Sequence, residues 1–104
     1  MKVVLLPFAK NDLEEIRSYL EKESPQASKI VGGKTRKSLL LLSENPYIGI
    51  IKDDEDILEW HIPGIPYTFP YRILNNQIQI LRVFHEAQDK PSKWEINNKG
   101  SSTA

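Results

Sequence analysis

The period of the apolar residues changes twice along this chain, from strand to helix and back, and those changes decide the expected fold class. Between Ala9 and Leu42 apolar side chains recur every three or four residues, as on one side of an α-helix. From Ile57 onward they occur in short extended runs. A strand, two helices and then three strands predict an α+β domain, with a helical hairpin on one face of a mostly antiparallel sheet of about four strands.

The helical part predicts two antiparallel helices. The first carries one apolar stripe, formed by Ala9, Leu13, Ile16 and Leu20. The second begins at Ser24 and Pro25, because a serine hydroxyl can cap a free amide and proline is favoured at the first helical position. It ends before Pro46, which disfavours helical geometry in the residue before it.

The extended runs predict the strands. Residues 2–7 are expected to form a first strand inside the sheet, because Val3, Val4, Leu5 and Leu6 make a continuous apolar run that Pro7 ends. Residues 46–56 are interpreted as a surface loop, and residues 57–62, 67–74 and 77–84 as strands. Asn75-Asn76 predicts a tight hairpin turn, and residues 77–84 a central strand. Because Pro70 has no backbone N–H to donate to a neighbouring strand, it predicts an edge position or a bulge.

Length and charge limit what the chain can be. At 104 residues we expect one domain over residues 1–96, with a short helix near Trp94 and a polar, mobile tail at residues 97–104. Lys and Arg together number 14, as do Asp and Glu, so no overall field would draw the protein to nucleic acid. The basic residues Lys29 to Lys37 are interpreted as a solvated helix face.

Several classes of site are not expected. The chain has no cysteine, which excludes disulfides, thiolate metal sites and cysteine catalysis. The acidic run at residues 53–56 lacks the spacing of a calcium loop, so neither a metal nor a cofactor is predicted. There is no secretory signal and no apolar run near the ~18 residues of a membrane span, so we expect a cytoplasmic protein that does not contact membranes.

A set of short motifs in a fixed order resembles the ParE/RelE toxin superfamily, also known as plasmid stabilisation proteins. The resemblance covers about residues 2–95. Its motifs are Ala9-x-x-Asp12-Leu13-x-x-Ile16-x-x-Tyr19, Asn45-Pro46-x-x-Gly49, Pro63-Gly64-Ile65-Pro66-Tyr67, Tyr71-Arg72-Ile73, and Ile80-Leu81-Arg82-Val83-Phe84-His85 followed by Ala87, Gln88 and Asp89.

The resemblance implies a bacterial toxin of a type II toxin-antitoxin module, neutralised by an antitoxin that wraps around it. Two activities occur on this fold: RelE-like members cut messenger RNA in the ribosome, and ParE-like members poison DNA gyrase. The long helical hairpin and the ending from His85 to Asp89 favour the ParE-like branch. A third possibility is that the protein is an attenuated family member that retains only antitoxin binding.

The ribonuclease alternative needs an acid, a base and cations at the reacting phosphate. The candidate catalytic residues are His85, Arg82 and Arg72, used only if the protein is a nuclease, with His85 the best acid or base because an imidazole titrates near neutrality. Thr68 stands where many nucleases of the family have an arginine, which argues against this alternative. The alternative is that His85 has only a structural role: it would end a strand and donate a hydrogen bond to a backbone carbonyl or to Asp89.

The remaining candidates could bind a target or an antitoxin. Arg82 lies in an apolar strand, so it should meet either a carboxylate or a partner. Aromatic residues near the third strand could form a stacking surface, although we expect two of Tyr67, Phe69 and Tyr71 to be core. The predicted binding residues are Trp60, His61, Tyr67, Tyr71, Arg72, Arg82 and His85. We expect a toxin that binds DNA gyrase and an antitoxin, with ribosome-dependent RNA cleavage as the alternative.

Overall fold

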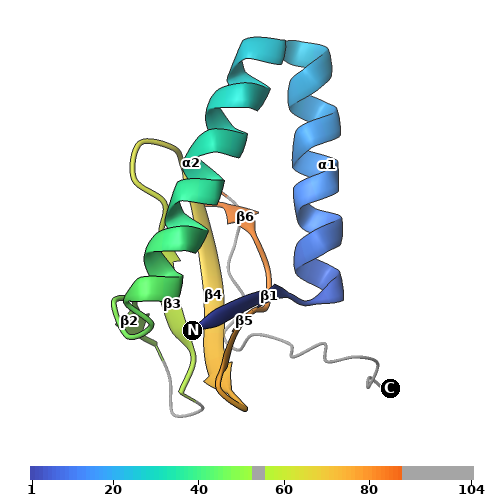
Figure 1. Ribbon diagram of the computed structural model, residues 1–104. Helices are drawn as coiled ribbons and strands as arrows, with labels where there is room; N and C mark the ends of the chain where they lie inside the picture. Colours follow the sequence, from blue (N-terminus) through green and yellow to red (C-terminus); the bar gives the residue numbers. More distant parts are fainter. Residues whose placement is uncertain (53–55, 88–104) are drawn as a thin grey trace.

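The chain forms a helical hairpin and a six-stranded sheet, which the computed structural model describes for residues 1–52 and 56–87 (Figure 1). The expected order of elements is confirmed; the predicted helix near Trp94 and the tail lie outside the described residues. The elements are β1 (Lys2–Leu5), α1 (Pro7–Glu23), α2 (Pro25–Glu44), β2 (Ile50–Ile51), β3 (Leu58–His61), β4 (Tyr67–Leu74), β5 (Gln77–Ile80) and β6 (Phe84–His85).

Ser24 is the single residue between the two helices, and it serves both. Its backbone is extended, and its N–H donates to the carbonyl of Leu20 at the end of α1. Its hydroxyl oxygen accepts the amide of Ala27 at 3.2 Å, which caps α2 as expected from the Ser-Pro pair. Both helices begin with proline. Figure 1 shows the closed end of the hairpin reaching beyond the sheet.

The sheet is mostly antiparallel, as predicted, in the order β1-β5-β4-β3-β2, with β6 paired to the start of β4. The pair β1 and β5 is parallel. The strand number exceeds four because two strands have only two residues each, and one of them, β2, lies in the segment expected to be a loop. The turn at Asn75-Asn76 is confirmed, with φ of 53° and 61° at the two asparagines.

The first strand lies at the edge of the sheet, so its expected interior position was wrong. The apolar run has another cause: both faces of β1 are covered. Val3 and Leu5 pack on the core beneath the helices, and Val4 packs on a second cluster at the opposite face. Cover on two faces therefore requires apolar residues at successive positions even where one edge has no strand beside it.

A bulge faces Pro70, which confirms one of the two alternatives predicted for this proline. Ile80 pairs with Tyr71, and Phe84 pairs with Thr68. Between these pairs β4 contributes residues 69–70, whereas the opposite chain contributes residues 81–83, one residue more. The ladder is thus interrupted at the position where Pro70 has no N–H to donate, although the Pro70 carbonyl still accepts the amide of Leu81 at 2.9 Å.

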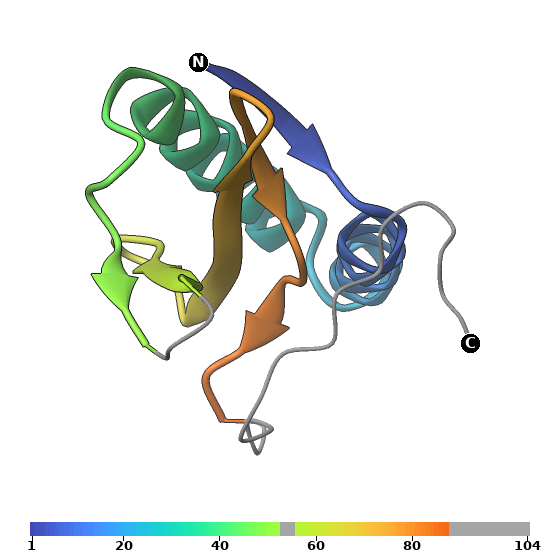
Figure 2. The same ribbon diagram turned by 90° about the horizontal axis from the view of Figure 1, so that it is seen from below.

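Two apolar clusters cover the two faces of the sheet, and residues of both helices pack into the same one of them. Figure 2 shows β5 between β1 and β4. The main core joins the helices to the strands through buried residues such as Ala9, Leu42, Phe69, Tyr71 and Ile80. The opposite side is called here the open face; it holds a smaller cluster of Leu6, Ile57, Leu81 and Phe84. Because strand residues alternate, Thr68 and Arg72 lie on this open face.

Candidate functional site

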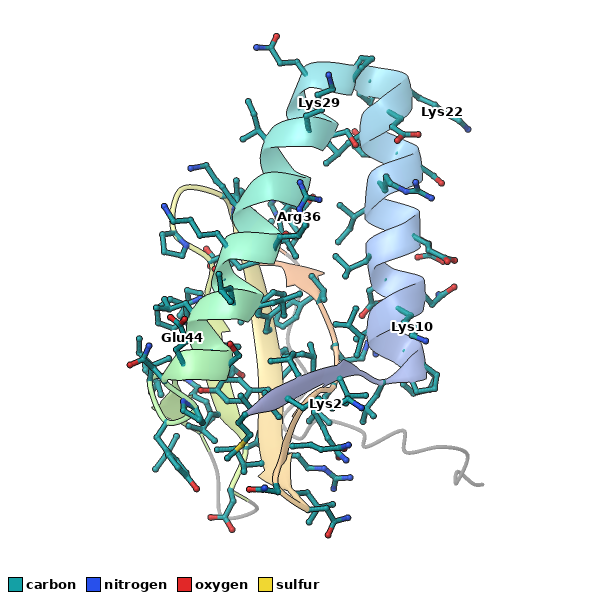
Figure 3. The ribbon with its side chains drawn as sticks, in the orientation of Figure 1. Lys2, Lys10, Lys22, Lys29, Arg36 and Glu44 are labelled. Carbon is teal, nitrogen blue, oxygen red and sulfur yellow. The ribbon has the colours of Figure 1, made fainter. Side chains whose placement is uncertain are left out.

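An apolar groove separates the two helices and is called here the interhelical groove. Its volume is about 690 Å³. Arg36 lies on the side of α2 that faces α1 (Figure 3), and Arg17 and Lys29 also border the groove, with Glu14 as its one acidic residue. Its apolar lining residues are Leu5, Leu13, Ile16, Leu20, Val31 and Leu39.

Arg82 is held by Asp12 of α1. The Nε and Nη2 atoms of Arg82 donate to the two carboxylate oxygens at 2.8 and 3.0 Å, and the guanidinium lies 5.3 Å from the ring centroid of Phe8. Asp12 also accepts the backbone amide of Val83 at 2.9 Å. The bulge places both partners, since it turns Arg82 toward α1 and leaves the Val83 amide outside the strand ladder. Of the two alternatives expected for Arg82, a carboxylate or a partner molecule, the structure shows the carboxylate.

His85 and Tyr67 are cross-strand partners at the helix side of the sheet. Their rings meet edge to face with centroids 5.2 Å apart. The Nδ1 atom of His85 accepts the amide of Ala87 at 3.0 Å, whereas the expected partner Asp89 lies outside the described residues. Burial, followed by the neighbouring Tyr19, raises the pKa of Tyr67 above its usual value, so its hydroxyl stays protonated at neutral pH.

These two residues line a small cavity beside the first helix, called here the α1 pocket, with a volume of about 230 Å³. One wall comes from the helix and the other from the sheet and the bulge. The lining residues are Asp12, Glu15, Ile16, Tyr19, Tyr67, Val83, Phe84 and His85. The pocket is therefore acidic on the helix side and aromatic on both sides.

On the open face, the side chains of His61, Thr68 and Glu86 come together from three separate segments. The Nδ1 atom of His61 lies 3.0 Å from Glu86 Oε2 and 2.8 Å from Thr68 Oγ1, and the Thr68 hydroxyl donates to Glu86 at 3.1 Å. Thr68 is fully buried, whereas His61 and Glu86 are partly exposed. Sequence reasoning assigned Glu86 no site role, although it stands in the ending from His85 to Asp89, because its partners lie on β3 and β4.

Arg72 lies elsewhere on the open face. Its Nε donates to Gln79 Oε1 at 2.7 Å, and its Nη2 atom is buried without a hydrogen-bond partner in residues 1–52 and 56–87. Burial lowers the pKa of the guanidinium. Arg72 and Arg82 are thus on opposite sides of the sheet.

The aromatic candidates divide between core and surface. Phe69 and Tyr71 are fully buried, so the expectation that two of the three aromatic residues are core is confirmed. The prediction that Tyr71 binds a partner was wrong for the same reason: its hydroxyl donates to the carbonyl of Pro46 at 2.8 Å and accepts the amide of Gly49. Trp60 is half-buried, and its indole N–H donates to Ser38 Oγ of α2 at 3.0 Å.

The structure therefore brings together only part of the predicted site. Tyr67 and His85 share the α1 pocket, and Arg82 lies beside it through Asp12. His61 and Arg72 lie on the other side of the sheet, so His85, Arg82 and Arg72 do not form one catalytic group. Sequence reasoning gave Asp12 no binding role, although it stands in the first motif of the family resemblance and its signal was present there.

The described part of the chain contains no helix long and apolar enough to cross a membrane. Among residues 1–52 and 56–87, no group of three or more histidine, cysteine or carboxylate side chains is arranged to hold a metal ion.

Comparisons with known proteins agree with this fold. The family described as the ParE toxin of type II toxin-antitoxin system, parDE, matches residues 3–90. The curated protein named "Putative toxin Y4kP", from Sinorhizobium fredii (strain NBRC 101917 / NGR234), is 34% identical over 79 residues, which cover 76% of this chain and 81% of that protein.

Among solved structures, a chain of the chromosomal ParDE TA system from P. aeruginosa superposes with a TM-score of 0.71. It covers 82% of this chain and 95% of its own length, and at 19% sequence identity the likeness concerns the fold alone. The match to the family over residues 3–90 carries the assignment: the chain belongs to the ParE toxin family of type II toxin-antitoxin systems.

Proposed function

We propose that this protein is a toxin that acts by binding a macromolecular target, with DNA gyrase as that target, and that a cognate antitoxin neutralises it in the cytoplasm. Membership of the ParE family supports the toxin role. The observation that favours binding over RNA cleavage is the separation of the three nuclease candidates: Arg72 lies on the open face, and Arg82 and His85 lie on the helix side.

Cleavage of RNA through its 2′-hydroxyl needs acid, base and cation around one phosphate, because charge grows on that phosphate in the transition state. The guanidinium of Arg82 is already paired in two hydrogen bonds with Asp12, which offsets its charge. Arg72 would have to reach the same phosphate through the sheet. The two described histidines are separated in the same way, with His61 on the open face and His85 beside α1.

The group formed by His61, Thr68 and Glu86 resembles a nucleophilic triad only in its residue types. In such a triad one ring nitrogen contacts the hydroxyl and the other contacts the carboxylate. Here both Thr68 Oγ1 and Glu86 Oε2 contact the same atom, Nδ1 of His61. The ring cannot relay a proton between them in that geometry, so we assign the group to holding the end of β6 against the sheet.

The interhelical groove supports the antitoxin part of the proposal. A groove of about 690 Å³ with six aliphatic lining residues is suited to the apolar side of a peptide helix. Three of its four charged border residues are basic, which favours a peptide with acidic flanks. An antitoxin segment in this groove would cover apolar surface that the free toxin exposes to water.

The deciding experiment is a gyrase supercoiling assay with purified toxin, repeated with toxin that was first mixed with its antitoxin. We expect supercoiling to be inhibited at micromolar toxin and restored in the mixture. Normal supercoiling at that concentration, with correctly folded protein, would refute gyrase as the target.

A parallel reaction with ribosomes and messenger RNA tests the alternative activity. We expect no site-specific cutting. Cutting that disappears in His85→Ala and persists in His61→Ala would establish the ribonuclease reading, because only His85 was placed in that candidate site.

A further inference from the structure

The face of α1 that borders the bulge carries a repeated arrangement of aromatic and acidic side chains. Phe8, Asp12, Glu15 and Tyr19 follow one another at spacings of four, three and four residues, which places them along one side of the helix. The first two hold the guanidinium of Arg82 between a carboxylate and a ring. The second two, Glu15 and Tyr19, present the same two kinds of group about two turns further along, in the reverse order.

The second pair borders the α1 pocket, where Tyr67 and His85 supply two further rings. Asp12 also lines the pocket, but its carboxylate oxygens already accept hydrogen bonds from Arg82 and Val83. Glu15 is different. It is exposed, it accepts one long hydrogen bond of 3.3 Å from Asn11, and among the described residues it forms no salt bridge.

We propose that the α1 pocket is a socket for one arginine side chain displayed by a partner protein. A carboxylate beside stacked or facing aromatic rings is the environment that a guanidinium prefers, since it can pair and stack at once. The pocket volume of about 230 Å³ suits one long side chain rather than a helix or a strand. Arg82 and Phe8 provide an example of this mode of binding within the same molecule.

Charge also favours a cation over an anion. Asp12 and Arg82 neutralise each other, which leaves the negative charge of Glu15 at the mouth of the pocket. Tyr67 stays a neutral phenol because burial raises its pKa, so its ring and hydroxyl can both face a guanidinium. This socket does not depend on the gyrase proposal, because it is defined by the pocket and not by the identity of the partner.

The test uses the full-length protein and the amide of N-acetyl-arginine as the probe, followed by NMR shifts of the Glu15, Tyr19 and Tyr67 signals. We expect saturable shifts at probe concentrations up to ~50 mM, the range of a contact made by one side chain. The amide of N-acetyl-citrulline has nearly the same shape without the charge, and it should bind at least about fivefold more weakly.

Three variants and a control make the result specific. Glu15→Gln should weaken probe binding about fivefold to tenfold, and Tyr19→Leu should weaken it more than Tyr19→Phe, which keeps the ring. Glu14→Gln removes the same charge one residue away, at the interhelical groove, and should bind the probe like the natural protein. Equal binding of citrulline, or Glu14→Gln and Glu15→Gln weakening binding equally, would overturn the proposal, as would no shift at all.

Discussion

Arg82 and Asp12 are 70 residues apart in the sequence, and two hydrogen bonds of 2.8 and 3.0 Å join their side chains. The pair links the bulge after β5 to the first half of α1. Because Asp12 also accepts the Val83 amide, one carboxylate fixes both the side chain and the backbone of the bulge. The geometry of the α1 pocket therefore depends on this contact, although neither residue was predicted to meet the other.

Removing Asp12 should destabilise the fold more than removing Arg82. Asp12→Ala leaves the Val83 amide and the Arg82 guanidinium without their acceptor, and we expect a loss of about 2–3 kcal/mol. Arg82→Ala leaves the bond to Val83 in place and should cost about 1–2 kcal/mol, less in high salt because Arg82 is partly exposed. Urea unfolding of the two single variants and the double variant gives the coupling free energy between Asp12 and Arg82, which we expect at about 1–2 kcal/mol. Strict additivity would contradict the contact.

Tyr71→Phe tests the buried phenol that fastens the segment after α2. The substitution keeps the ring but leaves the Pro46 carbonyl and the Gly49 amide without their partner, so we expect a loss of about 1–3 kcal/mol at neutral pH. Trp60→Phe, which removes a hydrogen bond to Ser38 from a half-buried ring, is the control and should cost less.

The same tyrosine predicts a pH dependence. Burial raises the pKa of Tyr71, and the hydrogen bond from Gly49 opposes that shift in part. A raised pKa in the folded state means that the folded protein holds its proton more tightly than the unfolded chain. The stabilisation that comes from the protonated Tyr71 phenol is fully present below the pKa of about 10 that tyrosine has in the unfolded chain. It is lost as the pH rises through the higher pKa of the folded state. Stability measured from pH 9 to 11 should fall less steeply in Tyr71→Phe than in the natural protein; parallel curves would contradict this.

Gly49 should tolerate no larger residue. A Cβ atom there would lie 2.7 Å from the Tyr71 hydroxyl and 2.9 Å from the Glu59 carbonyl oxygen, closer than such atoms approach. Tyr71 is held from both sides and Glu59 is backbone, so neither can move freely. We expect Gly49→Ala to cost about 1–3 kcal/mol in thermal or urea unfolding. Gly33→Ala is the matched control, because no atom beyond its chain neighbours and its own helix backbone lies within 4 Å of a Cβ atom there, and alanine favours a helix.

Local signals predicted most of the fold. Ser24 and Pro25 marked a helix start, Asn75-Asn76 marked a turn, and the changes of period gave the order of the elements. Pro70 predicted either an edge position or a bulge, because its missing N–H must fall where the ladder is interrupted, and the structure has the bulge. The edge position of β1 was not predictable from its own residues. A continuous apolar run indicates that both faces of a strand are buried, and it does not indicate how many strands lie beside it.

The site was predicted less completely, because a strand residue does not reveal which side of the sheet it faces. Arg72 and Arg82 resemble each other in the sequence, yet the bulge turns Arg82 toward α1 while Arg72 points to the open face. Glu86 meets His61 only because β6 returns beside β4. Contacts of this kind depend on register, and a change of one residue in register exchanges the two faces.

Substitutions in the interhelical groove should separate antitoxin binding from folding. Leu20 and Val31 line the groove near the end of α1 and the start of α2, and both are only partly buried in the free toxin. Placing an acidic side chain there puts a charge against the apolar face of a docked helix, which is costly once water is excluded. We expect Leu20→Glu and Val31→Glu each to weaken antitoxin binding at least about tenfold in calorimetry.

The control for these variants is Leu40→Glu, which adds the same charge to an exposed position of α2 outside the groove. It should bind the antitoxin like the natural toxin. Circular dichroism and thermal unfolding must remain close to those of the natural protein in all three variants, so that weaker binding reports the surface and not the fold. In growth assays with co-expressed antitoxin, Leu20→Glu should become toxic and Leu40→Glu should stay neutralised, provided that the groove holds the antitoxin and not the target. Growth arrest with Leu40→Glu alone would move the antitoxin site to the other side of α2.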